Sequence, residues 1–297
     1  MELEGFVIKC LGGFYTVETA QGMVTCRARG KFRKDGISPC AGDRVTVQAD
    51  GGSGALIEIL PRKNHLVRPP VANLERLFVV ASLRDPAVNL PLIDKTLAVA
   101  EVNGVEPVVI FTKIDLGDPG PLLETYRLAG IECCAVCSER GEGLVQVREL
   151  AAGKVSAFIG NSGVGKSTLL NAVFPGLELE TGEISQKLGR GRHTTRHVEF
   201  YPLPEGGYAA DTPGFSTFDV ERYKLTDTEQ LVAGFREIER FSHDCQFTSC
   251  SHTCEKGCAV LRAAAEGKVA KSRIESYGAM YQEIKGVKKW EQKNKHV

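Results

Sequence analysis

Hydrophobic and polar residues change their pattern twice along the chain. In residues 5–60 the apolar residues come in short alternating runs, separated by glycine-rich turns. Alternation with a period of two predicts strands that are buried on one face. The expected strands are Gly5–Lys9, Phe14–Thr19, Met23–Ala28, Arg44–Gln48 and Ala55–Ile59. Short strands at this spacing suit a small barrel, either an oligonucleotide-binding (OB) barrel or an SH3-like one.

After Pro69-Pro70 apolar runs alternate with longer helix-like segments, which is typical of an α/β domain with a buried, mostly parallel sheet. The expected strands are Leu77–Ala81, Val108–Phe111, Glu132–Val136, Val155–Ile159, Val198–Tyr201 and Tyr208–Ala210, and the expected helices are Leu90–Asn103, Leu122–Ala129, Leu144–Ala151 and Lys166–Val173. From about Tyr223 the pattern becomes helical and polar. We therefore expect domains at 1–68, 69–222 and 223–297.

The composition fits an ordinary globular protein, with 42% hydrophobic residues and a formal net charge of zero. No apolar run approaches the roughly 18 residues of a membrane span, and the first residues lack the pattern of a secretion signal. We expect a cytoplasmic monomer without a membrane partner. One cationic run, Arg27–Lys34, favours contact with nucleic-acid phosphates, although a solvated loop would look the same.

A phosphate-binding loop follows the predicted strand Val155–Ile159 and opens a predicted helix. This strand–loop–helix setting makes the G-x-x-x-x-G-K-[ST] match strong. In such a loop, backbone amides point at the phosphates, Lys166 reaches the β- and γ-phosphates, and the Ser167 hydroxyl binds Mg²⁺. The nucleotide-binding residues are Gly160, Asn161, Ser162, Gly163, Val164, Gly165, Lys166, Ser167 and Thr168.

A guanine-reading motif ends another predicted strand, and consists of Thr112, Lys113, Ile114 and Asp115. The Asp115 carboxylate can accept from N1–H and from the 2-amino group of guanine, two donors that adenine lacks. Thr112 stands where an asparagine is more common, so a hydroxyl replaces an amide that usually braces the loop.

Two further segments have the composition of GTPase switches. Asp211 and Gly214 belong to a D-T-P-G sequence in which the aspartate holds Mg²⁺ and the glycine amide senses the γ-phosphate. The glycine-rich stretch Thr181–Arg196 lies between this sequence and the phosphate loop, and is expected to act as switch I. Thr194 or Thr195 would complete the Mg²⁺ shell, and we assign Thr195.

The guanine motif precedes the phosphate loop, which precedes D-T-P-G, so the usual order of GTPase motifs is circularly permuted. With Gly191–Thr195 and Pro61–His65, this order resembles the RsgA/YjeQ family over essentially the whole chain. The resemblance implies an OB domain, a permuted GTPase domain and a C-terminal helical zinc domain. It also implies a GTP-hydrolysing enzyme that binds GTP and GDP, contacts the rRNA of the 30S ribosomal subunit, and acts in late maturation of that subunit.

Ten cysteines in a reducing compartment favour metal ligands over disulfides where they cluster. Six of them are scattered or lie in strand-like runs and are interpreted as small buried hydrophobes. The other four crowd around one histidine, and three thiolates with an imidazole suit structural Zn²⁺. Spacing alone leaves Cys254 and Cys258 interchangeable. The family's zinc motif implies Cys245, Cys250, His252 and Cys258.

Two positions depart from the family or from other GTPases. Cys137 and Ser138 stand where the family has a Ser-Ala guanine loop, so we expect their backbone amides to make the nucleotide contacts. Phe215 follows D-T-P-G, where many GTPases place a glutamine that orients the attacking water. The resemblance assigns that task to His193, and we expect slow hydrolysis by the isolated protein.

Two other functions fit parts of the pattern. One is an RNA-binding module in which guanine nucleotide is structural and turnover is negligible. The other is a small-molecule kinase, which the paired guanine motif and D-T-P-G sequence argue against.

Overall fold

The computed structural model describes residues 1–30, 32, 36–67, 70–177, 179, 198–211, 225 and 227–294; at Asp211 and from Val287 onward it describes only the backbone. The chain forms two compact units, and each collects several stretches of sequence. The first contains residues 1–77, 145–162 and 166–215, and the second contains 78–144, 163–165 and 216–297.

The N-terminal strands of the first unit close into a barrel. The strands are β1 (Glu2–Leu11), β2 (Phe14–Thr19), β3 (Gly22–Ala28), β4 (Arg44–Asp50) and β5 (Ser53–Ile59). They pair in the order β1-β2-β3-β5-β4, and β4 returns to β1. All these pairs are antiparallel except β3–β5. This Greek-key order is that of an OB barrel, so it decides between the two barrels that the pattern allowed.

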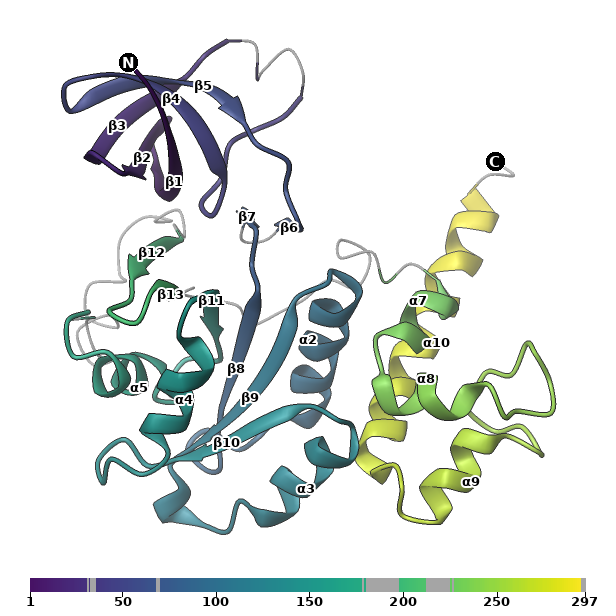
Figure 1. Ribbon diagram of the computed structural model, residues 1–297. Helices are drawn as coiled ribbons and strands as arrows, with labels where there is room; N and C mark the ends of the chain where they lie inside the picture. Colours follow the sequence, from purple (N-terminus) through teal and green to yellow (C-terminus); the bar gives the residue numbers. More distant parts are fainter. Residues whose placement is uncertain are drawn as a thin grey trace. The chain divides into compact units, whose positions relative to one another are not determined.

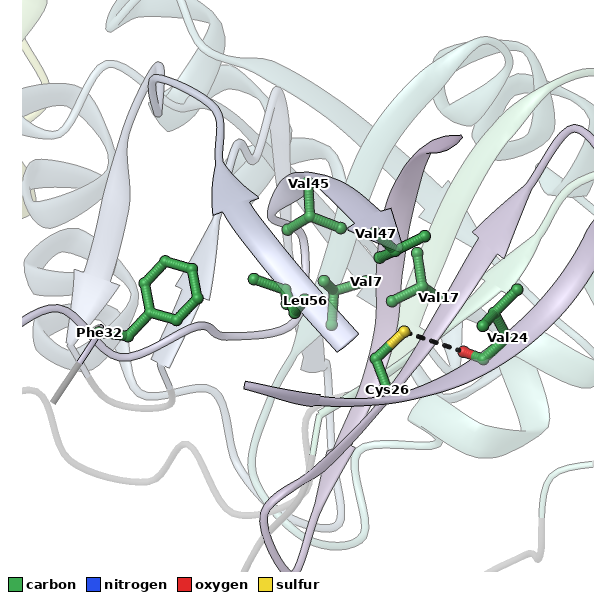
Figure 2. Packing of buried hydrophobic residues seen from close by; sticks show 8 residues of the cluster. All are labelled: Val7, Val17, Val24, Cys26, Phe32, Val45, Val47 and Leu56. Atoms are coloured by element: carbon green, nitrogen blue, oxygen red, sulfur yellow. Dashed lines mark hydrogen bonds between the residues drawn. The ribbon is translucent and has the colours of Figure 1, made fainter. Parts of the chain in front are cut away.

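Alternate residues of the barrel strands point inward and form one apolar core (Figure 2). Its fully buried members include Val7, Val17, Val45, Val47 and Leu56, and Phe32 closes one end. Cys26 lies in this core and is completely buried, as expected for a cysteine in a strand. The short antiparallel pair of β6 (His65–Val67) and β7 (Pro70–Ala72) was not predicted, because three-residue strands are too short to show alternation.

The rest of the first unit contains the strands that lead to the phosphate loop and to D-T-P-G. Strand β11 (Lys154–Ile159) pairs in parallel with β13 (Gly207–Asp211), and β12 (Glu199–Pro202) pairs antiparallel with β13. Helices α4 (Leu144–Ala151) and α5 (Lys166–Val173) flank β11 in sequence (Figure 1).

The second unit has a three-stranded sheet in the order β10-β9-β8. Its strands are β8 (Arg76–Ser82), β9 (Glu106–Thr112) and β10 (Glu132–Val136), and β9 and β10 run parallel. They are connected by α2 (Leu90–Val102), a 3₁₀ turn at Ile114–Leu116, and α3 (Gly120–Leu128). The alternation of strand and helix confirms the predicted α/β organisation.

The C-terminal part of the second unit is helical, as its polar pattern predicts. The helices are α7 (Thr228–Ala233), α8 (Arg236–Ser242), α9 (Ala259–Ala265) and α10 (Lys271–Asn294). Helix α10, drawn in yellow in Figure 1, packs against α2 and α7. No helix among the described stretches combines the length and apolarity that crossing a membrane requires.

A buried ionic cluster fastens these helices to α2. The Arg273 guanidinium on α10 bonds Asp94 of α2 at 2.8 Å and Glu237 of α8 at 2.6 Å, and all three residues are 0% exposed. The Tyr126 hydroxyl donates a further hydrogen bond to Asp94. Burial alone would lower the pKa of Arg273, but the two carboxylates raise it above its usual range. Arg273 therefore stays charged and joins three helices.

Replacing Arg273 with methionine should lower the free energy of unfolding by about 3–5 kcal/mol, because two buried carboxylates would lose their partner. Urea unfolding followed by circular dichroism measures this change. Lys271→Met is the matched control, since its ion pair with Glu275 lies on the solvent face of the same helix, and it should change stability by less than about 1 kcal/mol. Equal stability of the two variants would contradict the anchoring role of Arg273.

Candidate nucleotide site and metal centre

The phosphate loop occupies Gly160–Gly165, between the end of β11 and the first residue of α5. Gly163 and Gly165 have φ values of 83° and 85°, in the left-handed region that side-chain-bearing residues rarely adopt. These two turns curl the backbone between the strand and the helix N-terminus. The sequence therefore folds locally as a phosphate-binding loop requires.

The strand that leads to D-T-P-G ends beside the strand that leads to the phosphate loop. In the parallel register of β11 and β13, Phe158 lies opposite Asp211. The carboxyl ends of both strands therefore share one edge of the sheet. The Ser167 hydroxyl and a carboxylate at Asp211 are hard oxygen donors of the kind that Mg²⁺ prefers, so the donor set fits this ion.

The guanine motif contacts the phosphate loop directly. Thr112 ends β9, is 3% exposed, and donates from its hydroxyl to the carbonyl of Val164 at 2.6 Å. The Lys113 ammonium donates to the carbonyl of Gly163 at 2.9 Å and to that of Asp85. Lys113 itself has a φ of 57°, so the chain turns sharply there before the 3₁₀ turn that contains Ile114 and Asp115. The hydroxyl at position 112 thus braces the loop in place of an amide.

Cys137 lies just beyond β10 and donates from its thiol to Asp115 Oδ1 at 3.6 Å. Its backbone exchanges two hydrogen bonds of 3.1 Å with Glu142, which closes a loop that contains Ser138. Gly143 completes the turn at a φ of 76°, where a Cβ would lie 2.2 Å from the carbonyl oxygen of Ala135. The Asp115 side chain remains exposed for a base, while the buried Cys137 side chain fixes its orientation.

Several predicted site residues lie outside the described part of the chain. These are switch I with His193, Thr194 and Thr195, the residues Gly214 and Phe215, and Lys31, Arg33 and Lys34 of the cationic run. Asp211 is described by its backbone alone.

The C-terminal cluster has the geometry of a tetrahedral zinc site. The ligand atoms of Cys245, Cys250, His252 and Cys258 all lie within 4.8 Å of one another. The two sulfurs of Cys245 and Cys258 are 3.9 Å apart, and each lies 3.5 or 3.6 Å from His252 Nδ1. Zinc bonds of about 2.3 Å to sulfur and about 2.0 Å to nitrogen, at tetrahedral angles, give edges of about 3.8 and 3.5 Å. Cys254 is exposed and outside this group.

Backbone amides contact two of the four ligands. The amides of Ala259 and Leu261 donate to the sulfurs of Cys245 and Cys258, as expected for metal-bound thiolates. Burial lowers the pKa of His252, which favours the neutral imidazole that a metal needs.

Glu255 was not singled out from the sequence. Its carboxylate accepts hydrogen bonds from the amides of Ser251, Thr253 and Cys254. Although partial burial raises the pKa of Glu255, these hydrogen bonds lower it to about 2. A charged Glu255 therefore shapes the loop around His252. A carboxylate between two cysteines was its only sequence signal.

The permuted motif order, the phosphate loop and the guanine motif that touches it define a circularly permuted P-loop GTPase. Comparison with protein families identifies the branch: residues 59–221 match the RsgA GTPase family model and residues 4–57 match the RsgA N-terminal domain. The chain belongs to the RsgA family of GTPases.

Relatives of known name or structure agree over nearly the full length. A small ribosomal subunit biogenesis GTPase RsgA from Caldanaerobacter subterraneus subsp. tengcongensis is 44% identical over 98% of this chain and 99% of its own. The one from Moorella thermoacetica is 41% identical over 95% and 97%. The crystal structure of YjeQ from Thermotoga maritima superposes with a TM-score of 0.80 at 34% identity, covering 96% and 99% of the two chains. A structure of YloQ, described as a circularly permuted GTPase, gives 0.78 at 34% identity over 96% of each. The predicted fold and enzyme class are thereby confirmed.

Stripping the metal with a strong chelator, or changing Cys250 to serine, should unfold the loop between α8 and α9, because metal bonds hold its four ligands together. The Arg273 cluster should keep α8 and α10 on α2. Binding of a fluorescent GTP analogue should persist, since the guanine motif and phosphate loop make their contacts elsewhere. Cys254→Ser is the control and should keep one zinc per chain by elemental analysis. A purified parent protein without zinc would contradict the assignment.

Proposed function

We propose that this GTPase binds the small ribosomal subunit through its rRNA, hydrolyses GTP there, and assists the late maturation of that subunit as a cytoplasmic monomer. The observation that carries the enzymatic part is the contact of the guanine motif with the phosphate loop through Thr112 and Lys113. The names of the Caldanaerobacter and Moorella relatives, both small ribosomal subunit biogenesis GTPases, support the partner.

The barrel offers a surface of the right chemistry for RNA. Phe14 is 43% exposed, and the Arg27 guanidinium lies 4.5 Å above its ring. A cavity of about 520 Å³ beside them is lined by Tyr15, Arg29 and Phe32 among others. Aromatic faces with adjacent cations suit base stacking and phosphate contact. This surface supports rRNA as the partner over a protein.

In the proposed reaction, backbone amides of residues 160–168 and the Lys166 ammonium bind the phosphates, and Asp115 reads guanine. Ser167, Thr195 and Asp211 would hold Mg²⁺, which would supply positive charge to offset the charge that develops on the phosphates. The Gly214 amide senses the γ-phosphate. Phe215 cannot orient water, so His193 takes that role on the ribosome. Zn²⁺ in the Cys₃His site is structural, because all four positions are filled by protein.

Changing Asp115 to asparagine should shift nucleotide preference from GTP toward xanthosine triphosphate, because an amide donor can meet the carbonyl that replaces the 2-amino group. Competition against a fluorescent guanine nucleotide measures this shift, and we expect at least a tenfold change in the ratio of dissociation constants. Asp118→Asn, three residues further along the exposed turn, is the control and should leave the ratio unchanged. Retained GTP selectivity in Asp115→Asn would remove the guanine-reading role from this motif.

Purified 30S subunits should raise kcat for GTP by at least roughly tenfold, equivalent to about 1.4 kcal/mol of transition-state stabilisation. Stimulation should fall as salt rises, because phosphate contacts release counterions. His193→Ala should abolish stimulation and still bind GTP, while Lys166→Ala should lose turnover. Equal stimulation by 50S subunits would contradict the small-subunit mechanism. A parent enzyme without Lys166-dependent turnover would favour the RNA-binding module with structural nucleotide.

A further inference from the structure

A row of cross-strand neighbours runs over four adjacent strands of the first unit. It connects the barrel with Asp211, the residue proposed to hold Mg²⁺. Phe158 of β11 lies opposite Asp211 of β13, Asp211 lies opposite Glu199 of β12, and Glu199 lies opposite Lys9 of β1. The hairpin β12–β13 is therefore held between the strand that leads to the phosphate loop and the first strand of the barrel.

Polar and aromatic contacts fasten the barrel to the two ends of this hairpin. At the end near Asp211, Lys9 Nζ lies 2.6 Å from Glu199 Oε2, and both side chains are only 34% exposed. At the opposite end, the Tyr208 hydroxyl donates to Glu18 at 2.6 Å, and the ring of Phe6 stacks on that of Tyr208 with centroids 4.1 Å apart. Phe6 is 6% exposed, and its ring also packs edge to face on that of Phe200, with centroids 5.4 Å apart.

The position of the ion pair distinguishes it from the aromatic contact. Tyr208 pairs with Pro202, far from the phosphate loop, whereas Glu199 pairs with Asp211 at the strand end. The aromatic contact of Phe6 reaches Tyr208 and Phe200, which pair with Pro202 and Ala210. The Lys9–Glu199 pair acts at the register of Asp211 itself. Catalytic and metal-binding groups tolerate displacements of well under about 1 Å.

We propose that Lys9 and Glu199 are positioning residues for Asp211, through which the N-terminal barrel sets how tightly the nucleotide site binds Mg²⁺. This inference rests on the Mg²⁺ role proposed for Asp211. The ion pair holds β12 against β1. Backbone hydrogen bonds hold β13 against β12, and β13 in turn places Asp211 beside β11. A partner that moves the barrel would then change the affinity of the site for the metal.

The test measures Mg²⁺ binding without turnover. A fluorescent, non-hydrolysable GTP analogue is titrated with Mg²⁺, and the concentration that gives half of the Mg²⁺-dependent signal change is compared between variants. Lys9→Met and Glu199→Gln should each raise this concentration at least threefold. The exchanged pair, Lys9→Glu with Glu199→Lys, and the conservative Lys9→Arg should return it to within about 1.5-fold of the parent. Lys63→Met, which removes the ion pair between Lys63 and Glu75 elsewhere in the same unit, should not change it.

Asp211→Asn serves as the reference and should raise the concentration more than any other variant. If it does so while Lys9→Met and Glu199→Gln behave like Lys63→Met, the coupling proposed here is wrong and the role of Asp211 stands. If both single variants shift but neither the exchanged pair nor Lys9→Arg restores binding, the effect does not depend on the ion pair and the proposal is overturned. If Asp211→Asn itself changes nothing, the Mg²⁺ role of Asp211 fails, and the positioning role fails with it.

Discussion

The nucleotide site depends on two hydrogen bonds from the guanine motif to the phosphate loop. They join Thr112 to Val164 and Lys113 to Gly163. Base and phosphate recognition are encoded about fifty residues apart and in reversed order. They can serve one ligand only if both lie at the same edge of the sheet and keep a fixed separation. Hydrogen bonds from the side chains of the guanine motif to backbone carbonyls of the phosphate loop keep this separation. They do so whether the guanine motif comes before or after the loop in the sequence.

The same dependence explains what could be predicted from the sequence. Strand ends and glycine turns are local features, so the phosphate loop, the guanine motif and the parallel strands were all visible as patterns. The anchoring cluster was not visible, because Asp94, Glu237 and Arg273 come from three separated helices. Asp94 interrupts an otherwise apolar helix face, which was the only hint. Cys137 is buried as expected, but the contact of its thiol with Asp115 was not predicted, because it depends on a loop closure that spacing does not encode.

Spacing also could not choose the fourth ligand of the Cys₃His cluster. Cys254 and Cys258 are both compatible with a short knuckle, and only the folded loop separates them. Glu255 turns the chain so that Cys254 faces solvent while Cys258 caps α9 and approaches Cys245. The choice follows from three backbone amides that converge on one carboxylate. The family's zinc motif implied the same four ligands but gave no physical reason for the choice of Cys258 over Cys254.

The buried cluster of Arg273 has a consequence for where this protein can be divided. The family model of the GTPase ends at residue 221, so a fragment cut there would keep Asp94 and Tyr126 but lose the cation that neutralises Asp94. Such a fragment leaves without its partner a carboxylate that is fully buried and paired in the whole chain. Recombination between distant relatives at this boundary meets the same constraint. The end of the family model is therefore not a boundary of folding, because the GTPase part of the chain relies on Arg273 from beyond it.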